Sequence, residues 1–87
     1  MAWYRIAYRP TVLKDLAHVD SGMAQRLVDK TKWLASNAEN LRHESVTTEL
    51  PGLCKYAVAD WRIFYSLDRA EHLVEIHGIV QEKDLRR

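Results

Sequence analysis

Cysteine and glycine are scarce in this 87-residue sequence, and each shortage excludes a class of protein. Cys54 is the only cysteine, so the chain has no internal disulfide and no thiolate metal cluster, and its apolar neighbours favour a small core residue. The three glycines form no glycine-rich phosphate loop. Four histidines are scattered along the sequence in no ligand pattern, and we expect neither a bound metal nor a cofactor.

Net charge and long apolar runs are also lacking. The formal charge is only +1, so nucleic-acid binding would need a local basic patch. No apolar run approaches the roughly 18 residues of a membrane span, and the first residues do not resemble a signal peptide. We therefore expect a cytoplasmic protein with no membrane partner. A hydrophobic content of 47% in 87 residues predicts one globular domain, residues 1–87.

Aromatic and β-branched residues at 3–8 predict a first strand, with Tyr4, Ile6 and Tyr8 on one face. Pro10 closes that strand and begins a predicted helix over 10–19. A second helix is predicted over 23–37, with Asp20 or Ser21 as its cap.

The second half of the chain reads as strands joined by loops. Residues 38–52 show no periodicity, and a loop of this length suggests a working or partner-binding segment that ends in a turn at Leu50-Pro51-Gly52. Three strands are predicted over 53–59, 61–67 and 73–80, followed by a charged tail at 83–87. We expect an α+β fold in the order β-α-α-β-β-β, with two helices on one face of a four-stranded, mainly antiparallel sheet.

The hairpin around Ala59-Asp60 contains a charged residue that a core strand would not need. With a two-residue turn, Val58 faces Trp61 and Ala57 faces Arg62, whereas a bulged three-residue turn would shift this parity. Strand alternation then places Lys55 and Arg62 together on the face away from the core. Two cations there suit a phosphate ligand, but Arg62 could equally pair with Asp60 or Glu75 on a solvated face. The core face consists of Tyr56, Val58, Trp61, Ile63 and Tyr65.

These segments resemble the RelE/ParE superfamily of toxins from bacterial type II toxin–antitoxin modules, and the resemblance covers nearly the whole chain. The most specific part is Tyr56…Asp60-Trp-Arg-Ile-Phe-Tyr65, which is similar to the superfamily's Y-x-(V/L)-x-x-(D/G)-(W/Y)-R-(I/V)-x-Y segment. The Tyr4–Tyr8 strand, Leu50-Pro51-Gly52-Leu53 and the strand around Ile76–Ile79 fit as well. The resemblance implies a RelE-like fold and a cognate antitoxin as partner.

In the ribonuclease branch, the resemblance implies a ribosome-dependent mRNA endonuclease that inhibits translation. The ribose 2′-oxygen attacks the adjacent phosphate without a metal, which requires a proton acceptor, cations on the transition state and a proton donor. The resemblance assigns catalytic roles to Lys55 and Arg62, with Lys83 or Arg86 as replacements from the tail. The resemblance also makes His77 and Arg87 candidates for binding RNA. It places the last strand, with His77, beside the active surface, and Arg87 could reach that surface if the tail folds back.

Three positions depart from the ribonuclease pattern. Leu53 stands where a second lysine is expected, Glu82 where an arginine is expected, and Arg86 where a tyrosine often lies. Two alternatives therefore stay open beside the endonuclease: a ParE-like poison of DNA gyrase with no hydrolytic activity, and a catalytically degenerate module that binds its antitoxin and represses its own operon.

Overall fold

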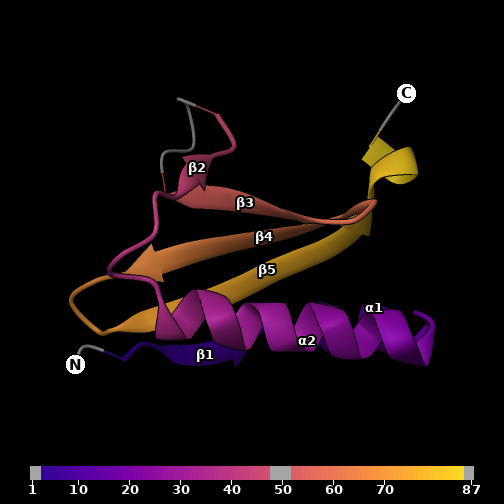
Figure 1. Cartoon of the computed structure of the whole chain (residues 1–87), viewed down its shortest axis with the longest axis horizontal. Coiled ribbons are helices and arrows are strands. Elements are labelled where there is room, and N and C mark those ends of the chain that lie inside the picture. The colour runs from indigo at the N-terminus through magenta and orange to yellow at the C-terminus, as the bar shows by residue number, and fades with distance from the viewer. Residues whose placement is uncertain (1–2, 48–51, 86–87) are drawn as a thin grey trace.

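The computed structural model, which describes residues 3–47 and 52–85, has two helices packed on one face of a five-stranded sheet (Figure 1). This confirms the predicted α+β class with two helices on one face of the sheet. The helices and strands, in chain order, are β1 (Arg5–Tyr8), α1 (Pro10–Ala17), α2 (Ser21–Ser36), β2 (Glu44–Ser45), β3 (Leu53–Val58), β4 (Trp61–Asp68), β5 (Leu73–Gln81) and the 3-10 helix η1 (Glu82–Leu85).

The sheet has the order β1-β5-β4-β3-β2, in which β1 runs parallel to β5 and the other pairs are antiparallel. The prediction of four strands was wrong by one, because β2 lies in the segment predicted as a loop. It pairs only Glu44 with Lys55 and Ser45 with Cys54. Two residues are too few to show an alternating pattern in the sequence. The predicted turn at Leu50-Pro51-Gly52 falls largely outside the described residues.

Both predicted helices are present and begin where their sequence signals indicate, although the end of the first helix differs from the prediction. Pro10 occupies the first turn of α1, where its missing N–H costs nothing. Asp20 caps α2 by accepting hydrogen bonds from the backbone N–H groups of Gly22 and Met23 at 3.1 and 3.3 Å. The first helix ends at Ala17 rather than at residue 19, since the next residues turn toward that cap. Neither helix in the described ranges is long and apolar enough to span a membrane.

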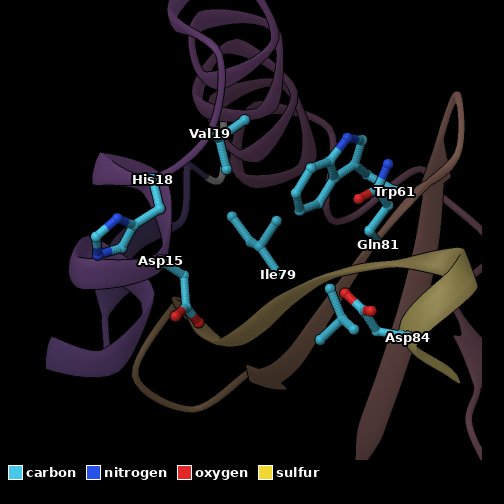
Figure 2. A pocket seen from close by; sticks show the side chains of 8 residues that line it. Asp15, His18, Val19, Trp61, Ile79, Gln81 and Asp84 are labelled. Atoms are coloured by element: carbon cyan, nitrogen blue, oxygen red, sulfur yellow. The ribbon is translucent and has the colours of Figure 1, made fainter.

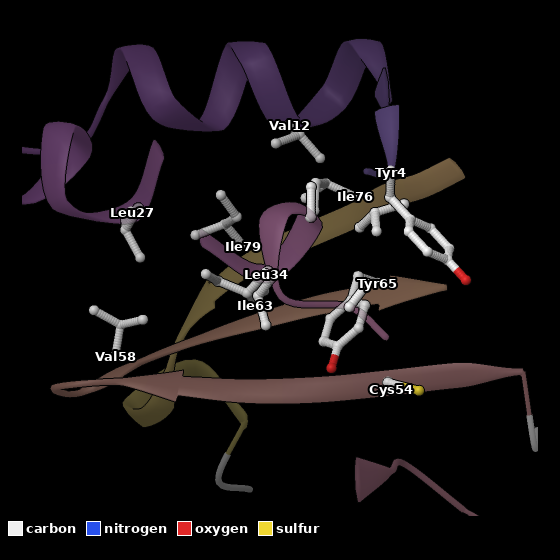
Figure 3. Close-up of a cluster of buried hydrophobic side chains, with 13 residues drawn as sticks. Tyr4, Val12, Leu27, Leu34, Cys54, Val58, Ile63, Tyr65, Ile76 and Ile79 are labelled. Carbon is white, nitrogen blue, oxygen red and sulfur yellow. The ribbon is translucent and has the colours of Figure 1, made fainter. Parts of the chain in front are cut away.

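The core lies between the helices and the sheet (Figure 3). Ile63 and Tyr65 of β4 are 0% and 1% exposed, and they pack in one cluster with side chains of both helices. The buried polar Thr31 shares a hydrogen bond of 2.6 Å with the hydroxyl of Tyr8 and donates to the carbonyl of Val28. The predicted core face of the hairpin is thereby confirmed, and Cys54 is buried in the same cluster.

The register of the β3–β4 hairpin is the predicted one: Val58 pairs with Trp61 and Ala57 with Arg62. The pairing of β4 with β5 contains an irregularity that the sequence does not predict. Phe64 pairs with Gly78, but Tyr65 pairs with Ile76, so His77 is an extra residue in β5. Such a β-bulge redirects side chains locally. Here it allows His77 to reach Ser66 of the neighbouring strand.

Candidate functional site

Arg62 lies near the start of β4, directly after the tight turn at Ala59-Asp60. The turn has two residues, and Ala59 adopts a left-handed backbone conformation with φ of 52°. Side chains alternate along the strand, so Arg62 points away from the face that holds its neighbours Trp61 and Ile63. We call the face that carries Arg62 the open face, because no α-helix in the described ranges packs on it.

The guanidinium of Arg62 joins three segments of the chain. One terminal nitrogen donates to the backbone carbonyls of Ala59 at 3.1 Å and Trp61 at 2.8 Å. The other donates to the Glu82 carboxylate at 2.8 Å, which is the distance of a strong charge-assisted hydrogen bond. Arg62 therefore ties the β3–β4 turn to η1. The sequence suggested Asp60 or Glu75 as its partner, and it missed Glu82.

Asp60 has a different role at the same end of the sheet. Its carboxylate accepts a hydrogen bond of 2.7 Å from the side-chain amide of Gln81, and its backbone carbonyl accepts one of 2.7 Å from the N–H of Glu82. These bonds join the turn to the end of β5. They position Glu82 beside Arg62 through its backbone, independently of its carboxylate.

The other cations predicted for the site lie in different segments of the chain. Lys55 of β3 lies on the open face, 3.7 Å from the carboxylate of Glu44 in β2, and the two side chains are 41% and 72% exposed. Such a pair contributes little to stability. Lys83 lies in η1 with its side chain exposed. Arg86 and Arg87 fall outside the described residues.

His77 lies farther along the open face and takes part in a short polar network. One of its ring nitrogens, Nε2, lies 2.8 Å from the hydroxyl of Ser66 and 3.5 Å from the carboxylate of Glu75. Glu75 in turn pairs with Arg9 at 3.4 Å. Burial, together with the charge of Arg9, lowers the pKa of His77 despite the opposing effect of Glu75. The imidazole is therefore neutral near pH 7.

Ser66 was not among the residues predicted from the sequence, although the signal for it was present. It lies four residues after Arg62 on the same strand, so alternation alone places the two side chains on one face. The β-bulge at His77 completes the contact, and the sequence gives no sign of that bulge.

Carboxylates neutralise three cations of the open face. Each of three cations has an acidic partner on another strand or in η1, within 4 Å. These pairs are Arg9–Glu75, Lys55–Glu44 and Arg62–Glu82. These pairings reduce the net positive charge of the described part of this face, which weakens its attraction for a nucleic-acid backbone.

A shallow cleft of about 310 Å³ opens beside the Arg62 contacts, on the side of α1 (Figure 2). Apolar side chains form its floor, and Asp15, His18 and Asp84 stand around it. In the described ranges, no group of three or more histidine, cysteine, aspartate or glutamate residues is arranged to hold a metal ion. The full lining is Asp15, His18, Val19, Trp61, Ile79, Val80, Gln81 and Asp84.

The segment before β2 is held to the core by one histidine. The two ring nitrogens of His43 lie 2.7 Å from the hydroxyl of Tyr65 and 2.8 Å from the carbonyl of Ala38. The Ala38 carbonyl can only accept, so the facing nitrogen carries a proton, and in the neutral ring the other nitrogen accepts from Tyr65. Burial raises the pKa of the Tyr65 hydroxyl, which stays protonated and can donate.

A family model identifies the class of protein to which this chain belongs. Residues 6–85 match the family model described as the ParE toxin of type II toxin-antitoxin system, parDE. The chain belongs to this ParE toxin family. The superfamily predicted from the sequence is thereby confirmed, and a comparison with curated proteins gives no significant match.

Solved structures of toxins and toxin–antitoxin complexes share the fold at low sequence identity. The RelBE2 complex from Mycobacterium tuberculosis has a TM-score of 0.81 and 18% identity, with 93% of each chain covered. The RelE–RelB complex from Pyrococcus horikoshii has a TM-score of 0.73 and 17% identity, covering 94% of this chain and 97% of the other. The isolated RelE toxin from Escherichia coli has a TM-score of 0.70 and 16% identity, covering 90% and 83%. Identities this low support the shared fold and not a shared activity.

Proposed function

We propose that this toxin arrests growth by binding a protein target, DNA gyrase, and that it has no hydrolytic activity of its own. The match to the ParE family model supports this choice between the two branches of the superfamily. The observation that carries it is the contact between Arg62 and Glu82 at 2.8 Å. An arginine engaged by an internal carboxylate is a poor ligand for a scissile phosphate, because the phosphate must displace a like charge.

The ribonuclease branch needs more than one arginine. Leu53 cannot act as an acid or base, and Glu82 adds negative charge where the reaction develops negative charge. Lys55 is exposed and already paired with Glu44. These features together weigh against transfer of the endonuclease mechanism to this chain.

The mRNA endonuclease remains a second candidate because of one observation. Lys55, Arg62, Ser66 and His77 share the open face. The neutral imidazole of His77 is able to accept a proton from a ribose hydroxyl, and the cations could stabilise a transition state. In this case RNA binding would have to displace Glu82 from Arg62.

A cognate antitoxin is the expected partner in either case. Several of the solved structures that share the fold are toxin–antitoxin complexes, among them those from M. tuberculosis and P. horikoshii. An extended or helical antitoxin segment laid across the sheet edge and the helices would cover this toxin while it is inactive.

Purified toxin mixed with DNA gyrase and relaxed plasmid tests the proposal. We expect loss of supercoiling and accumulation of linear DNA from trapped cleavage complexes, with both effects reversed by added antitoxin. The Arg62→Met variant is the matched control, and once shown to be folded it should inhibit gyrase as the wild type does. Unchanged supercoiling at saturating toxin would overturn the proposal. In that case codon-positioned mRNA cuts would favour the endonuclease, and a lack of both effects would favour a module that only binds its antitoxin.

A further inference from the structure

The carboxylate of Glu82 contacts Arg62 as an oxyanion ligand would. A guanidinium binds carboxylates and phosphates with the same donor geometry and at similar distances, and the Arg62–Glu82 distance of 2.8 Å is within that range. The chain therefore supplies an internal anion at a position where an external anion would otherwise bind.

The guanidinium is held in place by groups other than Glu82. Its second terminal nitrogen is fixed by the carbonyls of Ala59 and Trp61. The Arg62 and Glu82 side chains are 24% and 33% exposed, so solvent reaches both members of the pair. Removal of the Glu82 charge would leave an oriented and accessible guanidinium.

The backbone at Glu82 is held by contacts that do not involve its carboxylate. The N–H of Glu82 donates to the carbonyl of Asp60, and the Gln81 side chain donates to the Asp60 carboxylate. The substitution Glu82→Gln keeps the size of the side chain and removes only its charge. We therefore expect η1 to stay in place in this variant.

The surroundings of Arg62 also suit a phosphodiester. Ala57, its partner across the strands, has a small side chain, and Lys55 lies two residues further along β3 on the same face. Glu82 and Asp60 supply the nearby negative charge, and the Asp60 carboxylate is already bound by Gln81. Glu82 is therefore the carboxylate that directly occupies the guanidinium.

We infer that Arg62 is a latent phosphate-binding site, and that Glu82 is the residue that excludes single-stranded RNA from the open face. This inference rests on the proposed function, since it explains how a toxin with the fold of this superfamily lacks RNA-directed activity. One acidic residue at the start of η1 determines whether the arginine binds the chain itself or a nucleic acid.

Binding of a fluorescein-labelled oligouridylate, followed by fluorescence anisotropy at low salt, tests the inference. We expect Glu82→Gln to bind at least about fivefold more tightly than the wild type, the factor that one unit charge supplies at contact distance in water. The double variant Arg62→Met/Glu82→Gln should return to wild-type affinity. The slope of log affinity against log salt should be steeper for Glu82→Gln than for the double variant by about 0.7, as for one further phosphate contact.

Glu71→Gln is the matched control for net charge. Glu71 lies in the exposed turn at the opposite end of β4, and the substitution makes the same change in charge. It should leave affinity for the oligouridylate at the wild-type value. Inorganic phosphate, added as a competitor, should weaken binding of the oligouridylate to Glu82→Gln only at millimolar concentrations if the site prefers a phosphodiester chain.

Two results would overturn the inference. One is an unchanged affinity in Glu82→Gln. The other is a gain that persists in the double variant or appears equally in Glu71→Gln. The outcome is separable from that of the gyrase experiment, because it compares RNA binding among variants and needs no cellular target.

Discussion

On the face of the sheet that carries α1 and α2, Ile63, Val74 and Ile76 are completely buried, whereas the open face holds charged side chains that remain partly exposed. The covered face satisfies its few polar groups by hydrogen bonds within the core, as between Thr31 and Tyr8. On the open face, three cations are paired with carboxylates from other strands or from η1.

This difference separates what maintains the fold from what sets the charge of the candidate site. Apolar burial on the covered face provides the main driving force for folding. The acids that neutralise the open face come from β2, β5 and η1, and none of them belongs to the buried cluster. The chemistry of the open face can therefore change through single acidic residues while the core remains the same.

The largest expected effect is a difference in stability between substitutions of two adjacent residues on opposite faces of β4. Ile63→Ala should lower the free energy of unfolding by about 3–4 kcal/mol, since it leaves a cavity at a fully buried position. Phe64→Ala, on the half-buried open face, should cost only about 1–2 kcal/mol although it removes more atoms. Urea denaturation of both variants measures the difference. Equal losses would contradict the contrast between the faces.

A smaller loss is expected from the hydrogen bond that ties the segment before β2 to the core. Tyr65→Phe removes the hydroxyl that lies 2.7 Å from His43 and leaves a ring nitrogen without its donor. We expect a loss of about 1–1.5 kcal/mol in urea denaturation, and faster amide hydrogen exchange at residues 38–46. Tyr56→Phe, in a half-buried ring on β3, is the control and should leave exchange in that segment unchanged.

On the open face, Arg62→Met should cost about 1 kcal/mol, because the guanidinium is partly exposed and solvent weakens its contacts. Glu82→Gln should cost less, since the amide oxygen can still accept a hydrogen bond. A double-mutant cycle from urea denaturation should give a coupling of about 0.5–1 kcal/mol between the two residues. A coupling near zero would contradict the role of the pair in joining the turn to η1.

One substitution should stabilise the protein slightly. Ala59 has a φ of 52°, a conformation that glycine adopts without the steric penalty of a Cβ. Ala59→Gly should raise the free energy of unfolding by about 0.5 kcal/mol, after the greater entropy of glycine in the unfolded chain is subtracted. A lower thermal midpoint in this variant would mean that the turn is not strained.

The smallest expected effect is a pH dependence from His77. Its pKa is lowered in the folded protein, whereas in the unfolded chain it is about 6.5. The unfolded state therefore takes up the proton first as the pH falls below 6.5, and stability decreases until the folded pKa is also passed. His77→Gln should remove this part of the slope, measured by urea denaturation between pH 7.5 and about 5. The same slope in both proteins would contradict the shift.

The sequence predicted the fold well because its signals are local and periodic. Pro10, the Asp20 cap and the alternation from Tyr56 to Tyr65 placed both helices and the central hairpin with the correct register. The two-residue strand β2 and the bulge at His77 could not be predicted, because both depend on pairing with residues distant in the chain.

The candidate site was only partly predictable from the sequence. Alternation correctly placed Lys55 and Arg62 on one face, and the departure at Glu82 was visible as a charge reversal. Its contact with Arg62, 20 positions away in the sequence, follows from the turn at Ala59-Asp60 and the end of β5 lying side by side. The assigned roles of Lys83, Arg86, Arg87 and His77 remain predictions.

Mapping of mRNA 5′ ends in cells, before and after induction of the wild-type toxin, tests the central claim most directly. The claim is that Glu82 holds Arg62 away from phosphate and that the toxin acts without cutting RNA. The account predicts growth arrest with no new codon-positioned ends in translated messages. New ends that appear within minutes of induction, and that are lost in Arg62→Met, would contradict it.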